Sequence, residues 1–370
     1  MLFKSTSIRY TLRLFFAVLF AAGFGLAGYW AAGSSLSASE GRGAPILKPR
    51  ELPPPAGASE VLRASIAKSL PPNVEKAKNK TIVSADGWRQ LAASKDPAAI
   101  RVNEEFARGL SVTITDAVLG GVPVHRLLPA KISPAFSHCL FVYVHGGAFA
   151  VNRGRAALWE PILIARGLGI EVVSIDYRMI PDFPYPAAAD DVLAVWRELL
   201  KERAAHGMAL GGTSAGGNIA LASVQRFKNL GLELPGAVFA GTPWADLSKT
   251  GDSEFVNEGV DRQLVAYEGV LESAARAYAD GRDLRNPAVS PVYGNFVGFP
   301  PTILFAGTRD LFLSDTVRVH RKMRSKGVQA DLHVFEGASH GENTKLANAP
   351  ETLDFLKELR IFLRHHLSGH

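Results

Sequence analysis

The sequence predicts a mostly parallel α/β sheet with helices on both faces, preceded by segments that lie outside the sheet. From Ser111 to the C-terminus, short apolar runs alternate with stretches of helical periodicity. The apolar runs are continuous, which is typical of parallel strands that are buried on both faces. With 370 residues, of which 47% are hydrophobic and 21% are charged, the chain can bury a core of this kind.

Composition excludes several other classes of protein. The mean hydropathy of +0.07 does not fit a disordered chain or a multi-spanning membrane protein. The formal net charge is +6, without a block of like charge, so nucleic-acid binding is not expected. The single cysteine, Cys139, cannot form an intrachain disulfide or a zinc site that needs several thiolates.

The first 33 residues are predicted to be a signal peptide or an N-terminal membrane anchor. An uncharged apolar run extends from Leu14 to Ala32 and follows three basic residues, Lys4, Arg9 and Arg13. The run has about the 20 residues that span a bilayer and exceeds the usual signal-peptide core of about 7–15 residues, although small residues near Gly33 would permit cleavage. The bulk of the chain is therefore expected outside the cytoplasm, either membrane-anchored or periplasmic or secreted after cleavage. A buried N-terminal helix of the core is the third alternative.

Three further regions follow this leader. Residues 34–57 contain Ser, Gly, Ala and Pro, including Pro53–Pro55, and are predicted to be a flexible linker. Residues 58–110 have weak helical patterning without a chemical motif. Residues 111–370 form the main domain, with an insertion at about 245–290.

The elements of the main domain are expected in a regular order. The segments Val112–Val118 and Val122–Leu128 flank Gly120-Gly121 and are predicted to form a hairpin. Further strands are predicted at Leu140–Val144, Glu171–Asp176, Met208–Gly211, Ala237–Ala240, Thr302–Ala306 and Asp331–Phe335. Helices are predicted at Ala156–Ala165, Ala187–Lys201, Ala215–Lys228, Ser314–Ser325 and Glu351–His365. The interval Trp244–Pro300 breaks the alternation and has a helical pattern from Gly259 to Ala279, which indicates an insertion above the sheet.

A candidate nucleophile lies in the sequence Gly212-Thr213-Ser214-Ala215-Gly216, between a predicted strand and a predicted helix. A serine hydroxyl becomes an effective nucleophile when a tight turn exposes it within reach of a base. Small residues must flank such a turn, because strand and helix approach closely there. The context therefore favours Ser214 as a nucleophile over a bystander serine in a Gly-rich loop.

A candidate oxyanion hole follows the predicted strand Leu140–Val144. The sequence His145-Gly146-Gly147-Ala148 contains two consecutive glycines, which allow backbone N–H groups to point into a pocket. The N–H groups of Gly146, Gly147, Ala148 and Ala215 could then stabilise a tetrahedral oxyanion. A structural turn is the alternative interpretation. His145 is expected to orient the loop rather than to act as the base.

The candidate base and acid follow the last two predicted strands. His340 comes after Asp331–Phe335 through a loop of small residues, and Asp310 comes after the strand Thr302–Ala306. Loops at the carboxyl ends of neighbouring parallel strands meet at one edge of the sheet. Asp310 could there hold the imidazole in the required tautomer. Asp315 is the competing acid, although it is expected to begin a helix.

Together these motifs resemble those of the hormone-sensitive-lipase-like branch of the α/β-hydrolase esterases, from about Ser111 to the C-terminus. The resemblance extends to Tyr177-Arg178 and the aromatic and proline residues that follow. Two positions depart from the family pattern, because Ala148 replaces the usual third glycine and Thr213 replaces a frequent Asp; neither change removes a backbone donor. The resemblance implies an α/β-hydrolase fold with a helical cap made from residues 58–110 and about 245–290.

The predicted function is that of a serine carboxylesterase that hydrolyses short- to medium-chain acyl esters through an acyl-enzyme, without a metal or organic cofactor. A lactone, an acylated sugar or an acylated cell-envelope component would use the same three residues, Ser214, Asp310 and His340, and stays an alternative. A non-catalytic binding protein is disfavoured because all three residues are present. A peptidase is disfavoured because residues 34–110 are too short for a propeller. The expected partner is a small-molecule ester, and membrane attachment would involve residues 14–32. The sequence does not indicate an oligomeric state.

Overall fold

The computed structural model describes residues 51–367. The predicted leader at residues 1–33 and the linker up to residue 50 lie outside the described residues, so both predictions stay untested. Within residues 51–367, none of the helices has both the length and the apolar character needed to cross a membrane.

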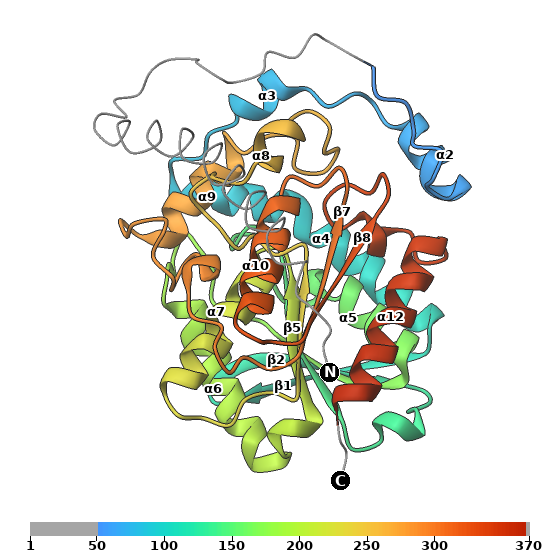
Figure 1. The fold of residues 1–370 in the computed structure, drawn as a ribbon, viewed down its shortest axis with the longest axis vertical. Helices are drawn as coiled ribbons and strands as arrows, with labels where there is room; N and C mark the ends of the chain where they lie inside the picture. Colours follow the sequence, from blue (N-terminus) through green and yellow to red (C-terminus); the bar gives the residue numbers. More distant parts are fainter. Residues whose placement is uncertain (1–50, 368–370) are drawn as a thin grey trace, which may run out of the picture. The chain divides into compact units, whose positions relative to one another are not determined.

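A single eight-stranded sheet organises the described chain (Figure 1). Its strands are β1 (Val112–Leu119), β2 (Val122–Pro129), β3 (Leu140–Val144), β4 (Glu171–Ile175), β5 (Met208–Thr213), β6 (Ala237–Gly241), β7 (Thr302–Gly307) and β8 (Ala330–Phe335). They lie in the order β1-β2-β4-β3-β5-β6-β7-β8. Strand β2 runs antiparallel to β1 and β4, and the other neighbours are parallel. The predicted hairpin and the mostly parallel sheet are confirmed.

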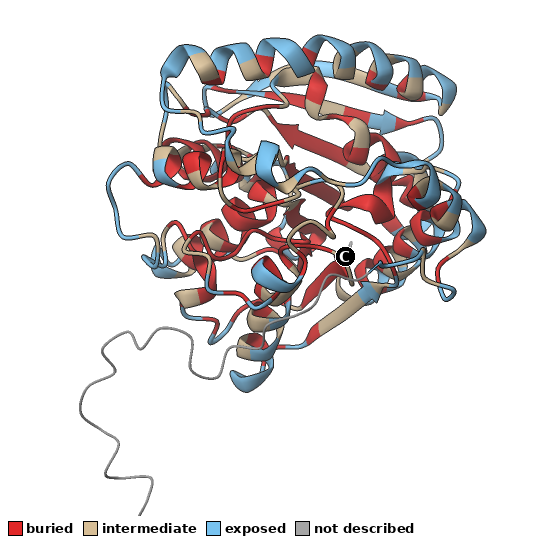
Figure 2. Cartoon of the chain, turned by 90° about the horizontal axis from the view of Figure 1, so that it is seen from above, coloured by how far each residue is buried: buried red, intermediate tan, exposed pale blue. Residues whose placement is uncertain are grey.

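Two layers of helices cover the sheet, because successive side chains of each strand point to opposite faces. In β3, Leu140, Val142 and Val144 pack in the core cluster shared with helices α6 (Ala187–Glu202), α7 (Ala215–Asn229) and α10 (Leu313–Ser325). The intervening Phe141 and Tyr143 pack in the cluster shared with α5 (Trp159–Ile164) and α12 (Pro350–His366). Figure 2 shows the buried residues gathered in the strands and on the inward sides of these helices.

A cap lies over one end of the sheet and consists of two separate segments. The N-terminal segment contains α2 (Glu60–Lys68), α3 (Val74–Lys78) and α4 (Ala85–Gly109), and the insertion contains α8 (Ser253–Val256) and α9 (Val270–Ala279). Figure 1 shows α3, α8 and α9 gathered at the same end of the sheet. The Ile82 N–H donates a hydrogen bond to Ser273 Oγ at 3.0 Å, and Lys78 pairs with Glu258 at 2.7 Å. The two segments therefore contact each other directly.

Two predicted helices are wrong in extent. The segment predicted as Ala156–Ala165 consists of a 3₁₀ turn (Gly154–Ala157), the short α5 and a wider turn at Ala165–Gly169. Pro161 lacks an N–H and fits only the first turn of a helix, so α5 begins close before it.

In the insertion, the helix predicted from Gly259 begins only at Val270, as α9. Gly259, Val265 and Gly269 have φ values of 72°, 67° and 90°, which a right-handed helix does not accommodate.

Candidate active site

Ser214 lies at a strained turn between β5 and α7. Its φ of 62° and ψ of −125° are outside the regions that ordinary residues adopt, at a cost of about 1–3 kcal/mol. A Cβ atom on Gly212 or on Gly216 would approach the Val144 carbonyl oxygen to 2.0 Å, so only glycine fits where β3, β5 and α7 converge. The Ser214 N–H donates to the Gly241 carbonyl at 2.9 Å, which ties the turn to β6.

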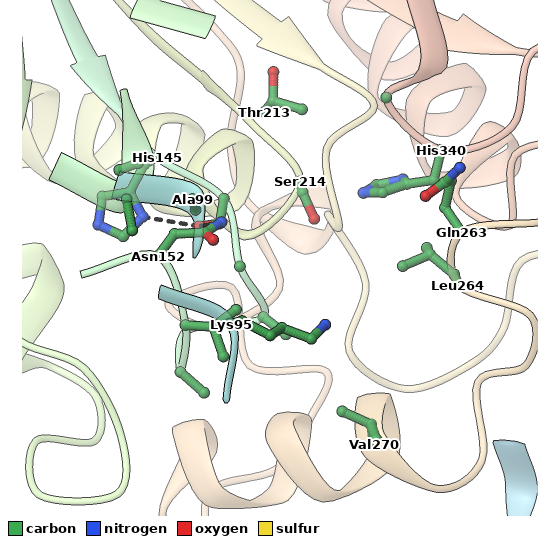
Figure 3. Close-up of a pocket in the computed structure, with 18 of the residues that line it drawn as sticks. Lys95, Ala99, His145, Asn152, Thr213, Ser214, Gln263, Leu264, Val270 and His340 are labelled. Carbon is green, nitrogen blue, oxygen red and sulfur yellow. Dashed lines mark hydrogen bonds between the residues drawn. The ribbon is translucent and has the colours of Figure 1, made fainter. Parts of the chain in front are cut away.

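His340 and Asp310 meet at the carboxyl ends of the neighbouring strands β8 and β7. The His340 Nδ1 atom lies 3.1 Å from Asp310 Oδ1, and the Asp310 side chain is completely buried. Phe312 N–H also donates to Asp310 Oδ1, at 2.8 Å. In Figure 3 the Ser214 hydroxyl and the His340 ring face each other across the cavity. The structure therefore brings the three predicted residues together.

Asp315 faces away from this site. Its Oδ2 atom accepts a hydrogen bond from the Asp246 N–H at 2.8 Å, and Oδ1 lies 3.6 Å from the Arg318 guanidinium. Complete burial, together with the negative charges of Glu254 and Asp246, raises the pKa of Asp315 well above its ordinary value. The competing acid is thus a structural carboxyl group at the start of α10 that does not contact His340.

Thr242 is a neighbour of the acid and the histidine that the sequence analysis did not identify. It follows β6, its Oγ1 donates a hydrogen bond to Asp310 Oδ2, and the same oxygen lies 3.0 Å from His340 Nδ1. Its position after a parallel strand, at the same sheet edge as Asp310 and His340, is the only sequence signal for this contact.

The cap insertion supports the loop that carries Asp310. Asn257 Nδ2 donates to the Asp310 carbonyl at 2.8 Å, and Asp261 Oδ2 accepts from the Leu311 N–H at 3.0 Å. Burial and the nearby charge of Asp310 raise the pKa of Asp261. The position of the predicted catalytic acid therefore depends on side chains of the cap.

His145 fixes the loop of the candidate oxyanion hole, as predicted. Its Nδ1 atom lies 2.8 Å from the Gly146 carbonyl oxygen, and its ring stacks on Tyr177 with centroids 4.2 Å apart. The Tyr177 hydroxyl donates to the His145 carbonyl at 2.8 Å, and Asn152 Nδ2 donates to the Gly146 carbonyl at 3.2 Å. Burial lowers the pKa of His145, which favours a neutral ring held in place by its neighbours.

The loop residues present free backbone donors to the cavity. Gly147 has a φ of 121°, and a Cβ there would lie 2.3 Å from the Val151 carbonyl oxygen. Ala148 takes a left-handed φ of 51°, which costs about 1 kcal/mol relative to glycine and explains why glycine is usual at this position. No described residue accepts a hydrogen bond from the N–H of Gly147, Ala148 or Ala215. Gly146 also lines the cavity.

A buried carboxyl group, Glu160, lies behind the nucleophile turn and was also not predicted. It accepts a hydrogen bond from Thr213 Oγ1 at 2.7 Å, and Tyr143 provides a second hydrogen bond. Burial raises the pKa of Glu160 to about 7, although both hydrogen bonds and the charge of His340 act in the opposite direction. Thr213 therefore holds a buried carboxyl group directly behind the nucleophile turn.

One cavity of about 900 Å³ is bordered by Ser214, His340, Glu160 and the loop residues 145–148 (Figure 3). Ser214 and His340 line it on the sheet side, and apolar residues of both cap segments line the other side: Trp88, Leu91, Val102, Leu264, Val270 and Leu271. Among residues 51–367, no group of three or more His, Cys, Asp or Glu side chains is placed to hold a metal ion.

Comparisons with known proteins agree with this geometry. A model of the α/β-hydrolase fold family matches residues 141–343. The crystal structure of an esterase, E25, is 46% identical with a TM-score of 0.86, over 88% of this chain and 99% of that chain. An esterase structure from the bacterial hormone-sensitive lipase family is 25% identical with a TM-score of 0.68, over 84% of this chain and 99% of that chain. An esterase of Acinetobacter venetianus is 28% identical over 263 residues, which are 70% of this chain and 84% of the relative.

Proposed function

The chain belongs to the α/β-hydrolase fold family, in its hormone-sensitive-lipase-like branch, and is a carboxylic ester hydrolase; on this premise we propose that it cleaves short- to medium-chain acyl esters with Ser214 as the nucleophile. The observation that carries the proposal is the meeting of Ser214, His340 and unpaired backbone donors in one cavity. The apolar cap residues would accommodate an acyl chain of moderate length beside the reacting carbonyl.

The proposed reaction proceeds through an acyl-enzyme. Ser214 Oγ attacks the carbonyl carbon while His340 Nε2 accepts the hydroxyl proton, because Nδ1 faces Asp310. The negative charge that develops on the carbonyl oxygen is stabilised by the N–H groups of Gly147, Ala148 and Ala215. His340 then donates the proton to the leaving alcohol. Water, activated by the same histidine, releases the acid and restores Ser214.

Asp310 and Thr242 would support the histidine during both steps. The Asp310 carboxylate accepts the Nδ1 proton and stabilises the imidazolium that forms in the transition state. Thr242 Oγ1 donates to the second carboxylate oxygen, so it holds the plane of the carboxylate toward His340. Thr242 is thus a positioning residue in this mechanism.

A fluorophosphonate probe and a series of nitrophenyl esters test the proposal. The wild-type protein should be labelled by the probe and should hydrolyse esters up to a medium chain length, whereas Ser214→Ala should lose both properties while it keeps its thermal unfolding temperature. Ser223→Ala, at a buried serine within α7, is the matched control and should keep the labelling. Turnover by Ser214→Ala above a few per cent of wild type would contradict the assignment.

The leader supports a proposal about location. The apolar run 14–32 and the basic residues before it would direct the hydrolase domain out of the cytoplasm, with residues 34–57 as a tether or as the start of the mature chain. Substrates would then be esters that occur outside the cytoplasm.

A further inference from the structure

Three lysines line the active-site cavity, and they come from separate parts of the chain. Lys80 follows α3, Lys95 lies in α4, and Lys345 ends the short helix α11 (Glu342–Lys345). Figure 3 shows Lys95 extending into the cavity, with its ammonium end between Ser214 and Val270 in this view. A positive charge therefore lies inside the space that a substrate would occupy.

The described cavity residues offer little negative charge to balance these lysines. Only Glu160 and Glu268 line the cavity as acids. Glu268 forms an ion pair with Lys249 and lies 3.9 Å from Lys78. Glu160 has a pKa of about 7, so about half of it is uncharged at pH 7.

The side chains of Lys80 and Lys95 form no ion pair with the described residues, and Lys345 has a neutral hydrogen-bond partner. The ammonium group of neither Lys80 nor Lys95 donates a hydrogen bond or forms an ion pair with any residue in the range 51–367. Lys345 donates to the neutral side-chain oxygen of Gln263. Asp96, the sequence neighbour of Lys95, is buried and accepts hydrogen bonds from the backbone N–H groups of Asn152 and Arg153.

Lys95 and Lys345 are close enough to influence each other. Desolvation lowers the pKa of Lys345 from its ordinary value, and the negative charges of Glu342 and Asp261 partly oppose this shift. The positive charge of Lys95 adds to the lowering. Lys80, Lys95 and Lys345 are all exposed to solvent, so salt screens their charges and the attraction to an anion is largest at low ionic strength. An anion placed between the two ammonium groups would relieve their repulsion and gain attraction from both.

We propose that the cavity selects esters that carry a negatively charged group away from the reacting carbonyl, with Lys95 and Lys345 as its binding partners and Lys80 at the rim. The inference rests on the proposed ester hydrolysis at Ser214 and adds the substrate class. Lysine acts as a point charge, so a carboxylate and a phosphate both meet the requirement. Neutral esters of the same length would bind without this attraction.

Two matched pairs of substrates test the proposal at low salt. Monoethyl adipate and ethyl hexanoate differ by a carboxylate on the acyl side, and 4-acetoxybenzoate and phenyl acetate differ by a carboxylate on the alcohol side. Acid release at constant pH gives kcat/KM for each, and the ratio of charged to neutral ester is the readout. Lys95→Gln and Lys345→Gln should each lower this ratio by about three- to tenfold in at least one pair, as expected for one charge several ångströms away.

Three controls separate the effect of the lysine charge on this ratio from the effect of altered packing. Lys95→Arg should keep the ratio because it keeps the charge. Lys131→Gln removes an exposed lysine before β3, at the opposite edge of the sheet, and should leave the ratio at the wild-type value. Raising the salt from about 20 mM to about 300 mM should reduce the wild-type ratio, because the Debye length shortens.

The outcomes distinguish this inference from the function on which it depends. If wild type cleaves the neutral esters and neither lysine variant changes the ratio in either pair, the charge selection is wrong and the esterase proposal stands. If wild type cleaves none of the four esters, the proposed function fails first. A lower ratio in Lys95→Gln that persists in Lys95→Arg would assign the effect to packing and would overturn the charge selection.

Discussion

At the scale of single residues, the two candidate acids differ in what surrounds them. Asp310 lies 3.1 Å from His340 Nδ1, whereas Asp315 accepts a backbone hydrogen bond from Asp246. Asp310→Asn should lower kcat by about 10²–10⁴-fold, because the amide cannot stabilise the imidazolium. Asp315→Asn should keep most of the activity, since Asp315 does not contact His340 and its burial, which raises its pKa, disfavours the charged form that the amide replaces. Turnover of one ester by both variants, together with thermal unfolding, decides the assignment. A larger loss in Asp315→Asn would reverse it.

Glu160 gives a prediction about stability and pH. Burial raises the pKa of Glu160 in the folded state to about 7, above the 4.5 of a free glutamate side chain. Between these two pH values the folded chain therefore holds a proton that the unfolded chain has released. The free energy of unfolding therefore falls as pH rises through this window, by an amount on the order of 1–3 kcal/mol for this group. Glu160→Gln removes the effect, so the unfolding temperature of the variant relative to wild type should rise from pH 5 to pH 8. Glu105→Gln, at an exposed position, is the control. A constant difference across this range would show that Glu160 does not titrate as described.

Site residues that lie in a local sequence motif could be identified from the sequence. Site residues whose role depends on tertiary contacts could not. Ser214 has glycines on both sides, and His340 and Asp310 each follow a recognisable strand. Thr242 and Glu160 carry no pattern of their own, because their roles arise only when β6 and α5 are brought beside the nucleophile turn. A hydroxyl or carboxyl group in an apolar segment does not reveal its partner.

At the scale of elements, the strands were predicted to within about two residues because continuous apolar runs mark doubly buried strands. The cap was harder to predict. The insertion contains only the short helices α8 and α9, and Gly259 and Gly269 lie between them with positive φ, where the backbone conformation depends on neighbours. A Cβ on Gly269 would lie 2.2 Å from the Ala77 carbonyl oxygen of the other cap segment. The hydrophobic pattern of the sequence does not predict this contact between the two cap segments.

A side chain of the insertion, Asn257, links the cap to the catalytic residues. Asn257 donates to the carbonyl groups of Thr308 and Asp310, at 3.2 and 2.8 Å, and therefore holds the loop that follows β7. Asn257→Ala should lower kcat by about tenfold with little change in KM, because a small displacement of Asp310 misaligns His340 without altering the cavity wall. Asn229→Ala, at the exposed end of α7, is the matched control and should behave as wild type. A rise in KM without a fall in kcat would mean that Asn257 acts on substrate binding instead.

At the scale of the whole molecule, the cavity is lined by segments that are far apart in the sequence. Residues of the N-terminal cap segment, the oxyanion loop, the nucleophile turn, the insertion and α11 all line it. Each part can be predicted to exist from its own sequence, but the gathering of Lys80, Lys95 and Lys345 around one space depends on the complete fold. The specificity of the site is for this reason less predictable from sequence than its chemistry.

The hydrolase domain should fold and act independently of the predicted leader at residues 1–33. Every residue that lines the cavity lies at or beyond Ala77, so deletion of residues 1–33 should leave an active esterase that stays in the cytoplasm. The full-length chain should be recovered with the membrane or outside the cytoplasm, because an apolar run of this length after three basic residues favours insertion or export. Fractionation followed by N-terminal sequencing separates the two versions, since an intact Met1 in the membrane fraction indicates an anchor and a new N-terminus near Ser34 indicates cleavage. Recovery of the untruncated chain in the soluble cytoplasmic fraction would contradict both, and an inactive truncated protein would mean that the first 33 residues support the cavity after all.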